Sequence, residues 1–299
     1  MTVPDTSDNR VLFEADYEKR IATITLNNPQ HRNSYDASMR ERLARYLDVV
    51  AEDDDLTVVL LRGADGVFST GADMNNAYGW YGEKKPEPGT APPKTRPSQR
   101  RRLTVDRKSF SFYHNLMGFP KITVGEISGY ALGGGFEMAL MMDIAVIGRD
   151  ARIGMPATRF LGPALGSLHM FFHRLGPVMA RRMLLTGDII EAGSIEHLGL
   201  FTETCAPEAV PARARYWAEK TAKMPADGVV IAKEAFRLVE QSQAYQGEEV
   251  ASYLFHAYGT NLQFSPGEFN FVKTRAQHGT KEAFRLRDEH FHVPEPELP

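Results

Sequence analysis

Residues 129–140 read GYALGGGFEMAL, a stretch in which an apolar strand passes through three successive glycines into an apolar helix. Because glycine has no side chain, such a turn leaves backbone N–H groups open to a closely approaching ligand. The first amides of a helix lack internal partners, and the helix dipole adds positive character there. We therefore predict that the turn Gly133-Gly134-Gly135 presents the Gly134 N–H to an oxygen that gains negative charge.

Two other uses of this glycine turn need no such oxygen. Glycines also permit tight packing between a strand and a helix, and the glycine turn by itself does not exclude that interpretation. Phosphate binding is less well supported, because the stretch has neither the G-x-G-x-x-G spacing nor the lysine of a P-loop.

Glu137 follows Gly134 by three residues, which places it one turn into the helix on the same face. Its neighbours are apolar, and partial burial would raise the pKa of its carboxyl group and suit it to proton transfer. The alternative is a first-turn carboxylate that only complements the helix dipole, which is worth about 0.3–1 kcal/mol.

A second glycine loop, GVFSTGADM at residues 66–74, follows a predicted strand at residues 57–61. Ligand-binding loops of α/β sheets lie at such strand ends. Gly71 would let the backbone turn so that the Ala72 N–H points into a cleft, which makes this N–H the predicted second donor. The alternative is an ordinary turn in which Asp73 is a helix N-cap.

The hydrophobic pattern around these loops predicts an α/β fold. Residues 20–26 alternate and are β-branched, while residues 57–61, 121–127 and 144–147 are short apolar runs, so all four are expected to be strands. Asp36 is expected to cap a helix that continues to Val50. Residues 1–206 are thus predicted to form the core that carries the site.

Residues 207–299 change to an almost entirely helical pattern, with helices expected at 212–223, 229–241, 248–262 and through Phe271 and Phe284. Within the core, five prolines between Pro86 and Pro97 predict an inserted surface loop at about residues 82–104.

Composition excludes several classes of protein. The chain has 299 residues, is 42% hydrophobic and carries a net charge of −3, so a general attraction to nucleic acid or to an anionic membrane is not expected. The single cysteine, Cys205, fits a reducing compartment and is expected to be buried and inert. With neither a basic, apolar leader nor a membrane-length apolar run, the sequence favours a cytoplasmic protein.

The two glycine loops together resemble the crotonase superfamily, also called the enoyl-CoA hydratase/isomerase family. The resemblance is carried by FSTGAD at 68–73 and GYALGGGFE at 129–137, and it covers residues 11–291 apart from the proline-rich insert. Further stretches that resemble the family are IATITLNNP at 21–29 with Asn33-Ser34, LTGD at 185–188 with Gly199-Leu200, and GTKEAF at 279–284 with Arg287-Asp288.

This resemblance implies a crotonase-like spiral of ββα units with a C-terminal α-helical trimerisation region, assembled as a homotrimer or a dimer of trimers. It implies a CoA thioester substrate whose carbonyl oxygen is held by the N–H groups of Ala72 and Gly134, with Glu137 as the acid/base. No permanent cofactor and no metal are expected, since coenzyme A arrives as part of the substrate. The implied CoA and substrate contacts are His31, Arg32, Ser34, Gly71, Asp73, Met74, Gly133 and Lys281.

The sequence departs from the family at one catalytic position. Family hydratases use two glutamates around a water molecule, and the second would follow Pro156, where this chain has Ala157. Alanine neither donates nor accepts a proton. Either Glu137 acts alone in an isomerisation, or another residue substitutes; the candidates are His114, Asp143, His169 and residues of the C-terminal helices.

Each of these substitutes also has a structural interpretation. Asp143 lies between a helix and a strand and is expected to be structural, and His114 lies among aromatic residues that suit an interface. His169 and His173 are one helical turn apart, a spacing that suits a metal, but no third ligand is near them in the sequence. The basic run at residues 100–108 is expected to be a solvated face, with attraction of CoA phosphates as the alternative and RNA binding a remote third.

Three functions therefore follow from the sequence. The leading hypothesis is a CoA-thioester hydratase or isomerase. The missing second glutamate also allows another enolate chemistry, such as C–C bond hydrolysis or decarboxylation. A CoA-binding scaffold without activity is disfavoured, because a dead site has no reason to keep the costly carboxylate of Glu137.

Overall fold

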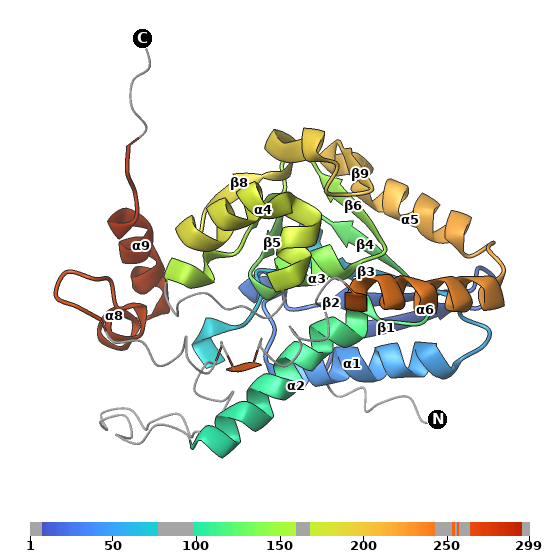
Figure 1. Cartoon of the computed structure of the whole chain (residues 1–299), viewed down its shortest axis with the longest axis horizontal. Helices are drawn as coiled ribbons and strands as arrows, with labels where there is room; N and C mark the ends of the chain where they lie inside the picture. Colours follow the sequence, from blue (N-terminus) through green and yellow to red (C-terminus); the bar gives the residue numbers. More distant parts are fainter. Residues whose placement is uncertain are drawn as a thin grey trace, which may run out of the picture.

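The centre of the fold is a six-stranded sheet with the order β1-β2-β3-β4-β6-β9 (Figure 1). The computed structural model describes residues 8–76, 98–159, 168–242, 253–254, 256 and 264–294. β1 runs antiparallel to β2, and every later pair of neighbours is parallel. The strands are β1 (Val11–Asp16), β2 (Ile21–Leu26), β3 (Val58–Gly63), β4 (Ile122–Ile127), β6 (Ile144–Gly148) and β9 (Glu203–Cys205).

A second, three-stranded sheet carries the glycine turn. Its order is β5-β7-β8, with β5 parallel to β7 and β7 antiparallel to β8. Its strands are β5 (Tyr130–Leu132), β7 (Arg152–Gly154) and β8 (Ile189–Glu191). The two sheets and the helices around them confirm the predicted α/β, crotonase-like fold.

The apolar runs of the main sheet are explained by burial on both faces. In β3, Val59 and Leu61 belong to one hydrophobic core, while Val58 and Leu60 belong to the other. Strands that are covered on both sides lack polar alternation, so the run at residues 57–61 is continuous rather than alternating.

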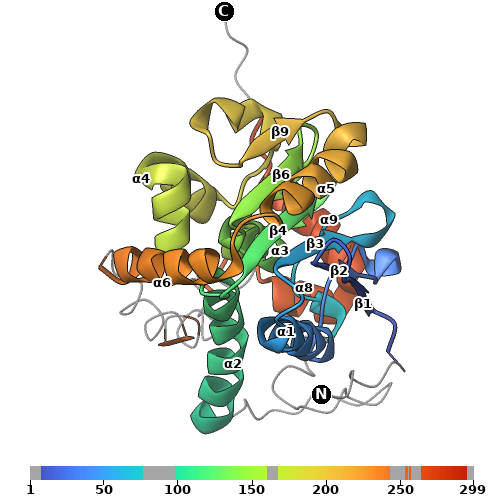
Figure 2. The same cartoon turned by 90° about the vertical axis from the view of Figure 1, so that its right-hand side faces the viewer.

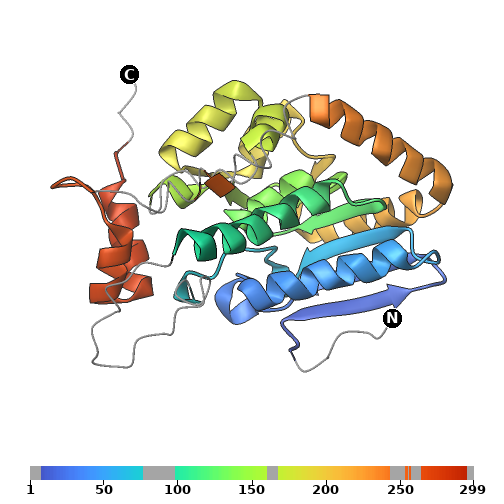
Figure 3. The ribbon, with the colours of Figure 1, turned by 60° about the horizontal axis from the view of Figure 1, so that its bottom comes forward.

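Helices cover both faces of this sheet (Figures 2 and 3). α5 (Val210–Thr221) packs on one face, where its small residues Ala214 and Ala218 join the core of Val58 and Leu60. α1 (Ala37–Glu52), α2 (Gln99–Met117) and α3 (Gly134–Met141) cover the other. The predicted cap of α1 is confirmed, since Asp36 Oδ1 accepts from the Met39 N–H at 2.9 Å.

The C-terminal part is mainly helical among the residues that the structure describes. After residue 207 the described regular elements are all helices, as the sequence predicted. Arg275 Nη1 of α8 donates a charge-assisted hydrogen bond of 2.5 Å to the Met74 carbonyl, which joins α8 to the loop after β3. The remaining helices are α4 (Leu168–Thr186), α6 (Ala226–Ser242), α8 (Phe271–His278) and α9 (Thr280–His290).

Four expectations are corrected or lie outside the described residues. The proline-rich loop ends earlier than predicted, because α2 begins at Gln99, with Ser98 Oγ accepting a hydrogen bond from the Arg101 N–H. Residues 77–97 of the predicted loop lie outside the described residues. Most of the helix expected at 248–262 lies outside them as well. Arg102 is buried within α2 rather than part of a solvated face. Cys205 is half-buried rather than buried, and desolvation raises the pKa of its thiol, which keeps it protonated and unreactive.

No helix among the described residues is long and apolar enough to cross a bilayer.

Asp143 fastens α6 to the end of the main sheet. Its Oδ2 accepts from the Thr123 N–H at 2.8 Å, from the Thr123 hydroxyl at 3.0 Å and from Lys233 Nζ at 2.5 Å. Lys233 is only 7% exposed, and its ammonium group is hydrogen-bonded to this carboxylate and to the Lys121 carbonyl. These bonds confirm the structural interpretation of Asp143.

We expect Asp143→Ala to lower the free energy of unfolding by about 2–4 kcal/mol, because it leaves a buried ammonium group without its counter-charge. Glu234→Ala is the matched control, since it removes an exposed ion pair to Arg237 on the same helix and should cost less than about 1 kcal/mol. Urea denaturation of both variants measures the difference. Equal losses would contradict this role for Asp143.

Candidate functional site

The two glycine loops of the sequence analysis lie side by side. Ser69, in the loop after β3, forms a parallel bridge with Ala131 of β5. The Ser69 N–H donates to the Tyr130 carbonyl at 2.8 Å, and the Leu132 N–H donates to the Ser69 carbonyl at 3.0 Å. The loop therefore runs along β5 up to the point where the chain enters α3.

Gly71 makes the closest approach between these loops. Its φ is +82°, a left-handed conformation that favours glycine. A Cβ at this position would lie 2.6 Å from the Leu132 carbonyl oxygen and 2.9 Å from the Gly134 nitrogen. Only a residue without a side chain fits here, so the residue before Ala72 lies directly against the start of α3.

The backbone bonds around Ala72 leave its N–H outside the local ladder. The Tyr35 N–H donates to the Gly71 carbonyl, and the Asp73 N–H donates to the Tyr35 carbonyl, both at 2.9 Å. In a parallel bridge of this kind the residue between the two bonded groups directs its own N–H away from the partner. Ala72 is that residue.

Gly134 is the first residue of α3, so its N–H has no carbonyl within the helix. Gly133 is the N-cap, with φ +54°, and its own N–H donates to the Gly154 carbonyl at 2.9 Å. The first helical bond runs from the Glu137 N–H to the Gly133 carbonyl at 3.0 Å. The turn thus has the geometry predicted for an N–H donor at a helix start.

Glu137 is 4% exposed and lies on α3 one turn beyond Gly134. The predicted burial of this carboxyl group among apolar neighbours is confirmed. Its charge acts on two tyrosines, Tyr35 and Tyr113, and contributes to raising the pKa of each hydroxyl.

Tyr35 and Tyr113 form a hydrogen-bonded pair of buried hydroxyls against Gly134. A Cβ on Gly134 would overlap both hydroxyl oxygens, so the glycine is required by these side chains as well as by the turn. Burial is the main cause that raises the pKa of both tyrosines, so both are neutral phenols near pH 7.

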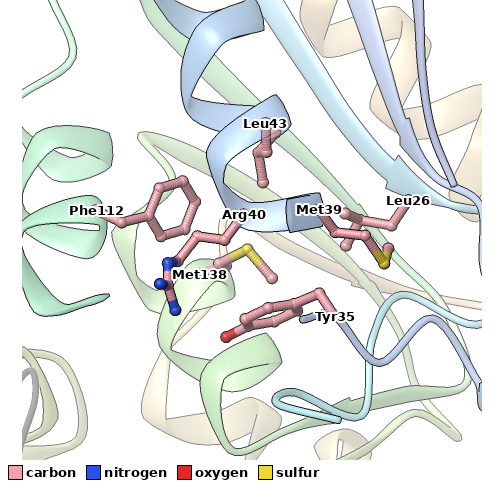
Figure 4. Close-up of a pocket in the computed structure, with 7 residues that line it drawn as sticks. All are labelled: Leu26, Tyr35, Met39, Arg40, Leu43, Phe112 and Met138. Carbon is pink, nitrogen blue, oxygen red and sulfur yellow. The ribbon is translucent and has the colours of Figure 1, made fainter. Parts of the chain in front are cut away.

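Tyr35 also lines a small apolar pocket between α1, α2 and α3 (Figure 4). In the figure its ring lies beside Met138 and Arg40, and its hydroxyl extends away from Met39. Arg40 is the charged residue of this lining, and its positive charge opposes the rise in the pKa of both tyrosines. The pocket is lined by Leu26, Tyr35, Met39, Arg40, Leu43, Phe112 and Met138.

The turn before α1 carries three of the implied CoA contacts close to the second loop. The Arg32 carbonyl accepts from the Thr70 N–H at 3.1 Å, and the Arg32 guanidinium lies 5.2 Å from the centre of the Tyr130 ring. His31 is exposed, whereas Ser34 is buried. These three residues are placed beside the glycine loops, and their contacts with CoA stay a prediction.

The other implied contacts are more dispersed. Asp73 Oδ1 accepts from the Asn75 N–H at 2.9 Å, so its side chain stabilises the short turn η3 (Met74–Asn76), in agreement with the capping alternative. Lys281 is exposed near the start of α9. Its contact with CoA stays a prediction.

Ala157 lies in the short 3-10 helix η4 (Pro156–Arg159) and is 7% exposed. The adjacent Thr158 hydroxyl donates to the Leu184 carbonyl, so it serves the packing of α4. The position at which the family's second glutamate was expected therefore supplies no acid or base.

The histidines weighed as substitutes belong to the helix packing. His114 is 2% exposed, its Nδ1 lies 3.0 Å from the Phe110 carbonyl, and its ring stacks on that of His169 with 6.4 Å between centres. Within the residues that the structure describes, no group of three His, Cys, Asp or Glu side chains is placed to hold a metal ion.

Sequence reasoning missed the tyrosine pair. Tyr35 directly follows the Asn33-Ser34 turn, and Tyr113 lies among the aromatic residues that were ascribed to an interface around His114. The residues are 78 positions apart, so only the packing of α2 against α3 and the turn before α1 reveals their contact.

We expect Gly71→Ala to destabilise the protein more than Gly66→Ala does. Both glycines have positive φ, so each substitution carries backbone strain of about 1–2 kcal/mol. A Cβ at Gly66 meets nothing within 4 Å, whereas one at Gly71 meets the backbone of Leu132 and Gly134 and should cost about 1–3 kcal/mol more. Chemical denaturation gives both values, and indistinguishable losses would contradict the close approach.

The chain is similar to known proteins over most of its length. Residues 16–281 match the family model described as enoyl-CoA hydratase/isomerase. A probable mitochondrial enoyl-CoA hydratase of Dictyostelium discoideum is 27% identical over 86% of each chain, and the 2,3-dehydroadipyl-CoA hydratase of Escherichia coli is 28% identical over 78% of this chain and 82% of its own. The crystal structure of an enoyl-CoA hydratase from Mycobacterium smegmatis superposes with a TM-score of 0.76 at 29% identity, covering 94% of this chain and 93% of that one. With the matched model spanning most of its length, the chain belongs to the enoyl-CoA hydratase/isomerase family.

Proposed function

We propose that the chain converts an enoyl-CoA thioester by stabilising a thioester enolate between the N–H groups of Ala72 and Gly134, with Glu137 moving the proton. The observation that carries this proposal is the close approach of Gly71, the residue before Ala72, to the Gly134 nitrogen. The names of the relatives, which are hydratases of CoA thioesters, support the same substrate class.

The physical basis is the placement of donors before charge develops. An enolate next to a thioester places negative charge on the carbonyl oxygen, and two fixed N–H groups stabilise it without reorganisation. Loss of a single donor of this kind costs about 10²–10³ in rate. Glu137 is buried one turn beyond Gly134 on the same helix, which supports the proposal that it exchanges a proton with the carbon beside that carbonyl group.

The CoA moiety is proposed to lie along the turn before α1. Arg32 and His31 lie beside the second loop there, and a guanidinium group pairs well with phosphate. Lys281, which is exposed on α9, is proposed as a further phosphate contact.

We also propose that the chain assembles as a homotrimer or a dimer of trimers through its helical C-terminal region. α6 carries apolar side chains that a single chain leaves in solvent, among them Ile231 at 71% and Leu238 at 70% exposure. Burial of such residues between copies would remove apolar area from water.

A panel of 2-enoyl- and 3-enoyl-CoA thioesters analysed by mass spectrometry tests the activity. A gain of one water identifies hydration, and an unchanged mass with a moved double bond identifies isomerisation. Cleavage of a carbon–carbon bond or loss of CO₂ would assign another enolate reaction. Binding of CoA thioesters without conversion of any would overturn the proposed activity and leave a binding scaffold.

We expect Glu137→Gln to lower kcat by about 10²–10⁴ with acyl-CoA binding largely kept, because the amide fills the same space but cannot exchange a proton. Glu126→Gln is the matched control. Glu126 is a partly buried carboxylate whose pKa is raised by desolvation, and it lies two residues after Val124, on the face of β4 that packs against α5. Steady-state kinetics and calorimetry give both quantities, and full activity of the Glu137 variant would exclude the assigned role.

A further inference from the structure

The Tyr35–Tyr113 pair connects the two proposed oxyanion donors. The backbone of Tyr35 is bridged to Ala72, while its hydroxyl lies against Gly134. The second hydroxyl reaches the same point from α2, so two separate elements deliver a polar group to Gly134. The pair is therefore part of the site rather than of the surrounding core.

The choice of side chains at this point argues against simple filling of space. Phe112, the neighbour of Tyr113 in the sequence, is as buried as Tyr113 but has no hydroxyl group. It lines the apolar pocket that Tyr35 also lines. Burying a hydroxyl costs free energy unless it is hydrogen-bonded, and two phenylalanines would fill nearly the same volume without that cost. The presence of two buried hydroxyl groups therefore points to a role in the chemistry of the site.

The proton inventory of the pair leaves one donor for a third group. Two neutral phenols carry two hydroxyl protons, and their mutual hydrogen bond uses one of them. The other is available to an acceptor outside the pair. Glu137 lies one turn beyond Gly134 on the same face of α3, which makes its carboxylate one neighbour of the pair, and its charge contributes to raising the pKa of both phenols. The thioester proposed at Gly134 is the other neighbour.

We propose that Tyr35 and Tyr113 form a proton relay between Glu137 and the bound acyl chain, supplying the second proton transfer for which Ala157 has no group. This inference rests on the proposed function of the site. It assigns the acid step to two neutral hydroxyls and leaves Glu137 as the single carboxylate that accepts and returns the proton.

The relay is balanced in protons. In a hydration, Glu137 takes a proton from water as the oxygen bonds to C3, and in an isomerisation it takes one from C2. The hydroxyl that faces the acyl chain then gives its proton to C2 in the hydration or to C4 in the isomerisation. The partner hydroxyl replaces that proton and is itself replenished from the Glu137 carboxyl, so both tyrosines and Glu137 end the cycle as they began.

The test uses Tyr35→Phe, Tyr113→Phe and the double variant, with Tyr46→Phe as the matched control. Tyr46 is another buried tyrosine, but its ring stacks on Phe13, 5.0 Å away, outside the site. A single substitution leaves one hydroxyl without its partner and can weaken folding, whereas the double variant removes both polar groups together and keeps the shape. Thermal unfolding confirms that each variant is folded.

Three measurements are compared: steady-state kinetics (kcat and KM) on the enoyl-CoA that the wild type converts, the Kd of butyryl-CoA, and deuterium exchange at C2 of butyryl-CoA in D₂O. In an isomerase, exchange at C2 needs only the carboxylate, whereas conversion needs the relay as well; in a hydratase the hydroxyls carry the C2 proton, so exchange needs the relay too. We expect the double variant to lose about 10²–10⁴ in kcat, with KM and Kd changed by less than about fivefold. Exchange should change by less than about fivefold if the enzyme is an isomerase and should fall with kcat if it is a hydratase. Glu137→Gln should lose exchange as well as conversion, and Tyr46→Phe should lose neither.

Each remaining outcome separates this inference from the proposed function. Wild-type conversion by the folded double variant would overturn the relay and leave the oxyanion site with Glu137 intact. In an isomerase, equal losses of conversion and exchange would also overturn it, because they would assign the tyrosines a purely structural role. In a hydratase, loss of conversion with exchange at C2 kept would overturn it, because the hydroxyls would then not carry the C2 proton. A wild-type protein that neither converts enoyl-CoA nor exchanges butyryl-CoA would overturn the proposed function itself.

Discussion

The contact of two backbone segments at Gly71 and Gly134 is the constraint on which the rest of the site depends. A side chain on Gly71 would collide with Leu132 and Gly134, and a side chain on Gly134 would collide with two tyrosines. Glycine at both positions lets the loop after β3, the start of α3 and the turn before α1 meet at one point. The neighbouring hydrogen bonds at Ser69 and Tyr35 hold that point in register.

The main sheet supplies the rigidity that this contact needs. Its inner strands carry apolar side chains on both faces, and α5 on one side and α1 to α3 on the other bury most of them. A loop at the end of such a strand is anchored by a core that cannot shift without losing packing. The same packing draws Glu137 into an apolar helix, where its carboxyl group is removed from most of the solvent that would otherwise screen it.

Local patterns in the sequence were sufficient for the parts of the fold that depend on near neighbours. The strands expected at residues 20–26, 57–61, 121–127 and 144–147 follow from hydrophobic periodicity, the cap at Asp36 from capping chemistry, and the helix start at Gly134 from the conformational freedom of glycine. The strands β1, β7 and β8 had not been predicted. Arg102 was misassigned because a run of basic residues suggests solvent exposure, whereas its place on α2 turns it inward. The start of α2 at Gln99 was hidden by the prolines that precede it.

The tyrosine pair could not be predicted because neither residue has a local signature. It exists only after α2 has packed on α3, which brings residues 78 positions apart into contact. The absence of an acid or base at Ala157 was visible in the sequence. Which other polar groups lie near Gly134 could be seen only in the structure. The signal that points to the pair is three-dimensional: a glycine whose missing side chain is replaced by two hydroxyls.

One carboxylate with two phenols differs electrostatically from two carboxylates around a water molecule. Two carboxyl groups at close range cannot both be ionised without repulsion, so one of them must have a raised pKa and carry a proton. Neutral hydroxyls avoid that repulsion, and the rise in their pKa caused by burial and by Glu137 keeps them protonated as donors. In the proposed reaction, only the charge of Glu137 then has to be accommodated beside the enolate. The buried Ala157 adds no second charge there.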